Sequence, residues 1–329
     1  MDIVKKKLRQ VLSFNKPIQA LIEGVVLVYL LQKTKNNIED NKNRHIRVRI
    51  LRRGIEKLKK AMSDVHYKQG ILIVGEEAYA SFEGIFLNVR GTNRYLKVTG
   101  DAFGNEGKPI LDFLRSKGVE VGTMIDLGAN FGEISLYMSK QYPRAKILAV
   151  EASPDNFRLL ESNIHFQQFS TVNLSLLCEA VSDRKGFVEI TKGVNPENII
   201  AHPSIHLKES DLGKKIETVR VPSDTLESIM SRFNFTTLDF LKVDIEGSEP
   251  LLFESLRMCA RKIRAILIEV GDKADHHTYL PLMRFLFAEY HVAYDAGTGS
   301  KWTSFESFEK SMLSSYAQDI WFVREEKKL

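Results

Sequence analysis

Met124-Ile125-Asp126-Leu127-Gly128-Ala129-Asn130-Phe131-Gly132 is the most informative segment of this chain for its fold class. A short apolar run ends in an acid, a turn with two glycines follows, and Ile134 to Gln141 has the composition of a helix. Glycine permits positive φ and lets a ligand approach the backbone closely. The segment therefore predicts a strand, a tight turn and a helix with a ligand at the turn. An ordinary strand–helix turn is the alternative.

The spacing of the two glycines excludes two common nucleotide-binding classes. Gly128 and Gly132 form Gly-x-x-x-Gly, whereas dinucleotide-binding turns have Gly-x-Gly-x-x-Gly. No Lys-Ser/Thr pair follows, so a P-loop is excluded as well. A glycine turn without a phosphate-binding pattern suits a ligand such as S-adenosylmethionine, whose methionine part carries an amine and a carboxylate.

A second acid ends the next predicted strand. Glu151 follows the apolar run Lys146 to Val150 and stands 25 residues after Asp126. A carboxylate at this place can accept hydrogen bonds from ribose hydroxyls, as in other nucleotide-binding sheets. The alternative is an exposed glutamate that begins the helix before Pro154.

A third acidic group follows the predicted strand Leu238 to Val243. Asp244, Glu246 and Glu249 come within six residues of one another. Three carboxylates this close repel one another unless a cation, a proton or a polar ligand compensates them. Glu249 can instead be a helix-start residue that complements the helix dipole.

Around these motifs, strands alternate with helices, and this alternation predicts a parallel sheet with helices on both faces. The predicted strands are 124–127, 146–150, 172–178, 238–243 and 263–270, and the predicted helices are 109–117, 134–141, 154–164 and 250–258. Near the end, a helix over 279–289 precedes a strand at 291–294, which can pair with 319–323 as an antiparallel edge. In such sheets, ligands bind at the carboxyl ends of the strands.

Taken in order, these segments resemble the FkbM family of S-adenosylmethionine-dependent methyltransferases. The pattern is Asp-x-Gly-Ala-Asn-x-Gly from Asp126, Glu-x-x-Pro from Glu151, Ala-Val-Ser-Asp from Ala180 and Leu-Lys-x-Asp-x-Glu-Gly-x-Glu from Leu241. It covers about residues 100–295. The resemblance implies an α/β class I methyltransferase fold, which is a Rossmann-like seven-stranded sheet. It also implies O-methylation of a hydroxyl on a sugar, a glycan or a small-molecule natural product.

The resemblance also implies which residues bind the cofactor S-adenosylmethionine. They are Asp126, Gly128, Ala129, Asn130, Gly132, Glu151, Ala152, Ala180, Val181 and Asp244. The residues from Asp126 to Gly132 would surround the methionine portion, Glu151 would hold the ribose, and Ala180 and Val181 would flank the adenine. Glu179 departs from the pattern, because the family has an asparagine there.

A hydroxyl acceptor needs a base, because an alcohol is a weak nucleophile. The catalytic candidates are Asp244, Glu246, Glu269 and His276, together with the adjacent His277. In related small-molecule methyltransferases, acids at the ends of these two strands hold magnesium. Asp244 and Glu269 would be its ligands here, but the sequence does not favour a metal.

The charge of the chain divides it into two parts. Residues 1–70 hold 17 Lys or Arg against 6 Asp or Glu, whereas the rest carries a net charge of −6. Residues 1–70 are predicted to be a basic helical extension that contacts a membrane surface, another copy of the chain or the body itself. The rest divides into a small strand-rich region at 71–100 and a methyltransferase domain at 101–329, in which 191–217 is a candidate acceptor-site lid.

Two alternative functions stay open. One is an RNA or other nucleic-acid methyltransferase that uses the basic region, and the other is a non-catalytic S-adenosylmethionine-binding module. Nucleic acid is disfavoured, because Asp244-Ile245-Glu246-Gly247 replaces the Asn/Asp-Pro-Pro-aromatic sequence of base-amine methylation. The two cysteines exclude a disulfide framework and a cysteine-based zinc site. We expect a cytoplasmic protein, with a membrane-peripheral location as the second option.

Overall fold

The computed structural model describes residues 65–68, 71–74, 77–82, 85–88, 107–165, 167, 169–191, 202–203, 218–271, 276–314 and 318–324. The chain divides into two compact units, residues 1–104 and 105–329. Residues 1–64, where the basic helices and their membrane or subunit contacts are predicted, lie outside the described residues. Within the described ranges, no helix has the length and the apolar character that crossing a bilayer requires.

The described part of the first unit is an antiparallel sheet with the order β1-β2-β3-β4. Its strands are β1 (Val65–Lys68), β2 (Ile71–Val74), β3 (Glu77–Phe82) and β4 (Ile85–Asn88). Two-residue connections with a glycine in each join them, as is typical of hairpins. β1 lies at the end of segment 1–70, after the residues for which the basic helices are predicted, and its sequence alternates at the period of a strand.

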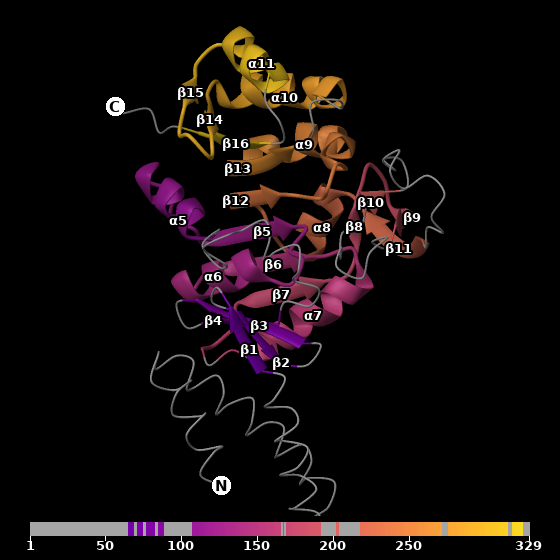
Figure 1. The fold of residues 1–329 in the computed structure, drawn as a ribbon. Coiled ribbons are helices and arrows are strands. Elements are labelled where there is room, and N and C mark those ends of the chain that lie inside the picture. Colours follow the sequence, from indigo (N-terminus) through magenta and orange to yellow (C-terminus); the bar gives the residue numbers. More distant parts are fainter. Residues whose placement is uncertain are drawn as a thin grey trace, which may run out of the picture. The chain divides into compact units, whose positions relative to one another are not determined.

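The second unit contains a sheet of eight strands in the order β15-β14-β16-β13-β12-β5-β6-β7 (Figure 1). Their bounds are β5 Thr123–Leu127, β6 Lys146–Val150, β7 Leu174–Leu177, β12 Leu238–Val243, β13 Ile263–Val270, β14 Ala293–Asp295, β15 Lys301–Trp302 and β16 Gln318–Val323. From β7 to β13 the strands are parallel, and β16 is antiparallel to both of its neighbours. The predicted α/β sheet is therefore confirmed, although not with seven strands.

The eighth strand and the place of β16 differ from the prediction for physical reasons. β15 has two residues, too few to produce a periodic pattern, and it pairs with β14 across the turn from Asp295 to Ser300. β16 lies between β13 and β14 and is not an edge strand. All four residues from Ile320 to Val323 are buried, as expected for a central strand.

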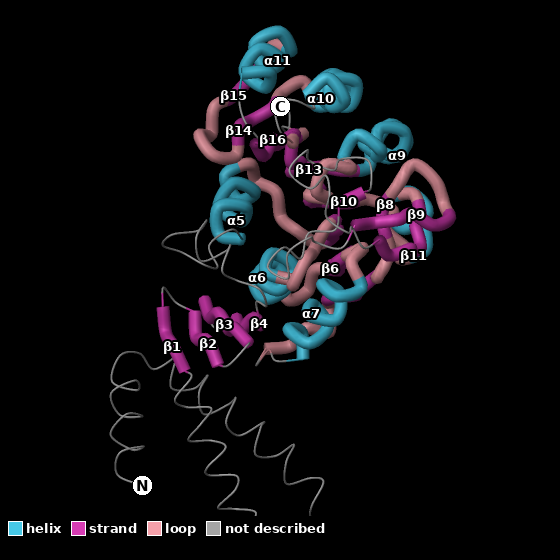
Figure 2. Tube along the Cα trace, turned by 45° about the vertical axis from the view of Figure 1, so that its right-hand side comes forward, coloured by secondary structure: helices cyan, strands magenta, loops and turns pink. Residues whose placement is uncertain are grey.

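Helices cover both faces of this sheet (Figure 2). They are α5 Gly107–Ser116, α6 Glu133–Gln141, α7 Pro154–His165, α8 Leu226–Arg232, α9 Phe253–Cys259, α10 His276–Tyr290 and α11 Phe305–Ser314, with the 3₁₀ turns η3 Glu249–Leu252 and η4 Ala260–Lys262. One face of the strands packs on helices α8 to α11, where Leu241 and Val243 join a continuous core. Phe113 of α5 stacks on Trp321 with ring centroids 4.3 Å apart, and Trp321 stacks on Phe240. Strand alternation thus places Phe240 and Lys242 on the face opposite to Leu241 and Val243.

A smaller sheet interrupts the alternation after β7, with the order β10-β9-β11-β8. It consists of β8 Ala180–Val181, β9 Gly186–Thr191, β10 His202–Pro203 and β11 Thr218–Asp224. The candidate lid 191–217 connects the antiparallel strands β9 and β11, and β10 lies within it. The rest of that segment lies outside the described residues.

Asp239 joins the first residues of β12 to those of β5. Its Oδ2 accepts hydrogen bonds from the Gly122 and Thr123 amides at 2.9 and 2.8 Å, and from Thr123 Oγ1 at 3.0 Å. We expect Asp239→Ala to lower the free energy of unfolding by about 2 kcal/mol, because two amides lose their acceptor. Urea denaturation measures the difference.

Asp112→Ala is the matched control for that change. The Asp112 carboxylate is exposed and pairs with Lys108 along one helix, so its removal should cost less than about 0.5 kcal/mol. Equal losses for the two variants would show that the Asp239 contacts do not stabilise the strand pair.

Candidate functional site

The turn after β5 has the backbone conformation that its glycines predict. Gly128, Asn130 and Gly132 have φ values of 79°, 52° and 94°. The amides of Gly128 and Ala129 donate to the Val150 carbonyl at 2.9 and 3.0 Å, which holds the turn against the end of β6. A Cβ on Gly128 would lie 1.7 Å from the Asp244 carbonyl oxygen. Only glycine therefore fits where the turn passes the end of β12.

Glu151 lies beside this turn, at the end of β6. Its Oε2 accepts the Asn130 amide at 2.8 Å, and its Oε1 accepts the Ser153 amide at 2.8 Å. The residue is only 5% exposed, and burial raises the pKa of its carboxyl to about 7, although both amides oppose the shift. The structure thus brings the Glu151 carboxylate, at the end of β6, into contact with the glycine turn that follows the neighbouring strand β5.

Asp126 lies at the base of the turn and is buried. Its Oδ2 accepts a hydrogen bond from Ser135 Oγ of α6 at 2.6 Å. Its Oδ1 lies 3.7 Å from the ammonium of Lys242, which also lies 2.9 Å from Asp244 Oδ2. Burial disfavours the charged form of Lys242, but the carboxylates of Asp244 and Asp126 outweigh it and raise the pKa of the ammonium.

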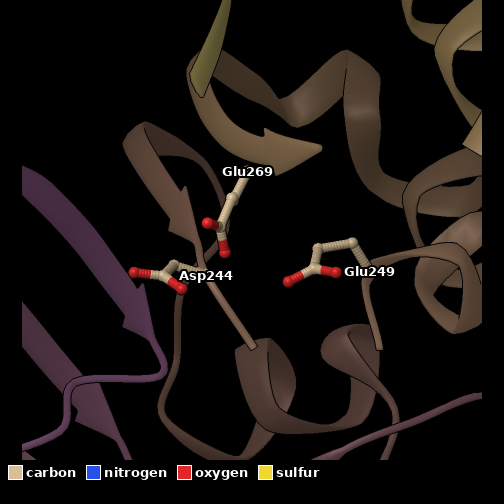
Figure 3. A group of neighbouring side chains, drawn as sticks. All are labelled: Asp244, Glu249 and Glu269. Carbon is tan, nitrogen blue, oxygen red and sulfur yellow. The ribbon is translucent and has the colours of Figure 1, made fainter. Parts of the chain in front are cut away.

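Three acids converge at the ends of β12 and β13, as Figure 3 shows. One oxygen from each of Asp244, Glu249 and Glu269 lies within 4.8 Å of the other two. Burial and the Asp244 carboxylate, followed by Glu246, raise the pKa of Glu269. Burial alone would raise the pKa of Asp244 too, but Lys242 and a hydrogen bond with Glu269 outweigh it and lower that pKa.

Glu249 belongs to the same cluster but is satisfied by the protein itself. Its Oε1 accepts the Ile245 amide at 2.8 Å, and its Oε2 accepts Tyr279 Oη of α10 at 2.7 Å. Glu249 is 0% exposed, and burial raises its pKa despite these donors. The repulsion expected among these acids is thus relieved by a lysine, by raised pKa values and by a tyrosine hydroxyl.

These contacts fit a magnesium ion poorly. Both Glu249 oxygens accept protein hydrogen bonds, and Lys242 already neutralises one oxygen of Asp244. Magnesium requires near-octahedral oxygen ligands, and a lysine ammonium beside the ligand set competes with it. The three carboxyl groups are better explained as a hydrogen-bonded and ion-paired cluster, in which the pKa values of Glu249 and Glu269 are raised.

The other predicted catalytic residues, Glu246, His276 and His277, are not part of the group of three acids. Glu246 is partly exposed, has φ 57° and is followed by Gly247 with φ 92°, so the chain turns sharply after β12. His276 begins α10, but its side chain lies outside the described residues. His277 is exposed on the same helix.

The residues predicted to flank an adenine come together at the start of the smaller sheet. Ala180 and Val181 are buried in β8, and Ala152 packs against the group formed by Ala180, Ile190 and Val221. The departing residue Glu179 forms two hydrogen bonds with Arg232 of α8, at 3.0 and 2.6 Å. Its carboxylate is therefore held by an arginine of the following helix.

Two residues of the site were not predicted from the sequence. Lys242 has a sequence signal, because it is a charged residue at a buried position of an otherwise apolar strand. Tyr279 has none, since its partner Glu249 is 30 residues away.

The residues of the candidate site fall within the part of the chain that one family model matches. The family model of the methyltransferase FkbM domain matches residues 126–292, just over half of the chain. Methyltransferase sdnD of Sordaria araneosa is 30% identical over an alignment of 148 residues, with coverage of 38% of this chain and 57% of that protein. Methyltransferase 1 of Beauveria bassiana is 25% identical over an alignment of 140 residues, with coverage of 38% of this chain and 55% of that protein.

The chain therefore spans a little over half the length of these two relatives. Among solved structures, a SAM-dependent methyltransferase from Agrobacterium tumefaciens is 12% identical, with a TM-score of 0.39, covering 82% of this chain and 79% of that one. The matched residues begin at Asp126 and include the glycine turn, Glu151, Ala180 and the three clustered acids. The chain belongs to the methyltransferase FkbM domain family.

Proposed function

We propose that this protein is an S-adenosylmethionine-dependent methyltransferase that acts on a hydroxyl of a sugar, a glycan or another small-molecule natural product. The observation that carries the proposal is the position of the glycine turn. It lies between Glu151 on one side and Asp244 on the other, in contact with both. One carboxylate is thereby available for a nucleoside, and a second group of carboxylates lies where an acceptor would bind.

The residues around the turn fit the cofactor. A carboxylate offers about four acceptor positions. Glu151 uses two for the Asn130 and Ser153 amides and a third for a longer contact, 3.5 Å, with Asn156 Nδ2. At least one position remains for a ribose hydroxyl. Ala180 and Val181 are small, apolar and buried beside Ala152, so they can contribute apolar contacts to an adenine.

The cofactor supplies a methyl group activated on a sulfonium. The chain supplies position and a base. Asp244, kept ionised by Lys242, places a negative charge beside the turn that suits a cationic centre. Glu269 is the better base of the pair once it is ionised, because its raised pKa makes its carboxylate the stronger proton acceptor.

The charge of the cluster supports a neutral acceptor. Asp244 and Glu246 follow β12, Glu249 begins η3, and Glu269 lies near the end of the neighbouring strand β13. The ionised Asp244 would repel a phosphate or carboxylate on the acceptor, whereas a neutral hydroxyl can donate its proton to a carboxylate of the cluster. This favours a sugar or natural-product hydroxyl over a nucleic acid.

A tritium-transfer assay tests the proposal. S-[methyl-³H]adenosylmethionine is incubated with the protein and panels of neutral glycans, polyketide alcohols and sugar phosphates. We expect transfer to members of the neutral panels, and full activity in excess EDTA. Glu269→Gln should lower kcat by about 10²-fold with little change in the KM for the cofactor, because only proton transfer is impaired.

Glu254→Gln is the control for that variant, because Glu254 lies on α9, exposed, and pairs with Arg257 in the same helix. An unchanged kcat in Glu269→Gln would exclude Glu269 as the base. A protein that fails to bind S-adenosylmethionine in calorimetry would contradict the methyltransferase proposal itself.

A further inference from the structure

Lys242 is a buried lysine for which the proposed reaction requires no direct contact with substrate. We propose that it is a positioning residue, which fixes the Asp244 carboxylate for cofactor binding and is itself anchored by Asp126. The inference rests on the proposed function, because it concerns the same cofactor. Lys242 is not among the residues predicted to bind the cofactor or to act in catalysis.

The geometry places Lys242 between the two acids. Lys242 and Asp126 are paired in register on the adjacent parallel strands β12 and β5. Asp244 follows Lys242 by two residues, which is the repeat that returns a strand to the same face. The ammonium donates to Asp244 Oδ2 at 2.9 Å and lies 3.7 Å from Asp126 Oδ1.

The exposed fractions of Lys242, Asp126 and Asp244 differ, and they indicate which of these side chains a ligand can reach. The side chains of Lys242 and Asp126 are 7% and 1% exposed, whereas that of Asp244 is 39% exposed. The lysine and its anchor are thus buried, and of these three side chains only that of Asp244 is exposed enough for a ligand to reach it. Lys242 acts on a ligand through Asp244.

The charges explain why a cation is needed at this position. Asp126 is held on its other oxygen by Ser135, so it cannot turn away from Lys242 without losing that bond. Without the ammonium, the Asp126 and Asp244 carboxylates would face each other with no charge between them. A buried charge that loses its partner is strongly unfavourable, so Asp244 would rotate toward solvent or take up a proton.

Calorimetric titration of the full chain with S-adenosylhomocysteine tests the inference, with Lys242→Met, Lys242→Arg and Lys262→Met as variants. Lys262 is exposed on η4 and serves as the control. We expect Lys242→Met to weaken binding about tenfold or more, which is the size of one oriented charged hydrogen bond. Lys242→Arg should restore most of the affinity, and Lys262→Met should bind as the unaltered chain does.

A double-variant cycle separates positioning from a general structural role. If Lys242 acts through Asp244, Lys242→Met should change the affinity less than about threefold in an Asp244→Asn chain, since the partner is already absent. Lys242→Arg guards against misreading an unfolded Lys242→Met chain, because it keeps a cation between the Asp126 and Asp244 carboxylates.

Three results would overturn the inference. They are unchanged affinity in a folded Lys242→Met chain, no recovery with arginine, and an equal loss of affinity with and without the Asp244 carboxylate. If the unaltered chain does not bind S-adenosylhomocysteine at all, the proposed function fails together with the inference. The two kinds of failure are therefore distinguishable.

Discussion

Replacing Gly128 with alanine should lower the free energy of unfolding by about 3 kcal/mol or more and abolish cofactor binding. Two costs add at this position. The residue has φ 79°, which costs an L-residue about 1–2 kcal/mol. The new Cβ would also lie 1.7 Å from the Asp244 carbonyl oxygen, a backbone atom that cannot move without disturbing the hydrogen bond from the Asp244 amide to the Leu127 carbonyl. Urea denaturation and calorimetry with S-adenosylhomocysteine measure both effects.

Gly118→Ala is the matched control, because it separates the two costs. Gly118 has a similar φ of 66°, but no atom lies within 4 Å of the position that a Cβ would take there. The Gly118→Ala variant should therefore lose about 1 kcal/mol of its free energy of unfolding, which is the conformational cost alone, and keep its cofactor affinity. If the two variants were equally destabilised, the close approach of the turn to β12 would not be what requires glycine.

Replacing Glu151 with glutamine should weaken S-adenosylhomocysteine binding by about 10–100-fold. If Glu151 accepts a ribose hydroxyl as proposed, the variant loses a charged acceptor, and hydrogen bonds to charged groups contribute about 1.5–3 kcal/mol. The single amide oxygen can also satisfy only one of the two amides that Glu151 now accepts, those of Asn130 and Ser153. Calorimetry at pH 8, where Glu151 is ionised, measures the loss, and the exposed Glu161→Gln on α7 is the control.

The same residue predicts a pH dependence whose sign is determined by its raised pKa. Burial raises the pKa of Glu151 from 4.5 to about 7, so the ligand-free folded chain binds this proton more tightly than the unfolded chain does. The protonated Glu151 carboxyl therefore contributes fully to the stability of the folded chain below pH 4.5, and this contribution is lost as the pH rises through about 7. Glu151→Gln should reduce the fall in Tm between pH 4.5 and 7. If Tm changed with pH in the same way in the variant and in the unaltered chain, the raised pKa of Glu151 would be contradicted.

Much of the site could be predicted because its parts are local in the sequence. The turn from Gly128 to Gly132 needs positive φ, and glycine at both positions shows it directly. Glu151 and Asp244 each follow an apolar run, so their place at the ends of strands follows from period and length. Parallel strands then bring both acids to one edge of the sheet.

The partners of those residues could not be predicted in the same way. Lys242 meets Asp126 across 116 residues of sequence, and Tyr279 reaches Glu249 across 30. Neither contact leaves a periodic pattern. The raised pKa of Glu269 likewise depends on burial and on neighbouring charges, which come together only once β12 and β13 lie side by side.

The amino-acid sequence alone specifies the alternation of strands and helices, the glycine turn and the acids at the strand ends, because each depends on a conformational preference or a period within a few residues. The entry of β16 between β13 and β14, and the buried lysine that separates Asp126 from Asp244, arise only in the folded chain. Those outcomes depend on which distant segments bury their apolar faces together, and on the charges that this burial forces into contact.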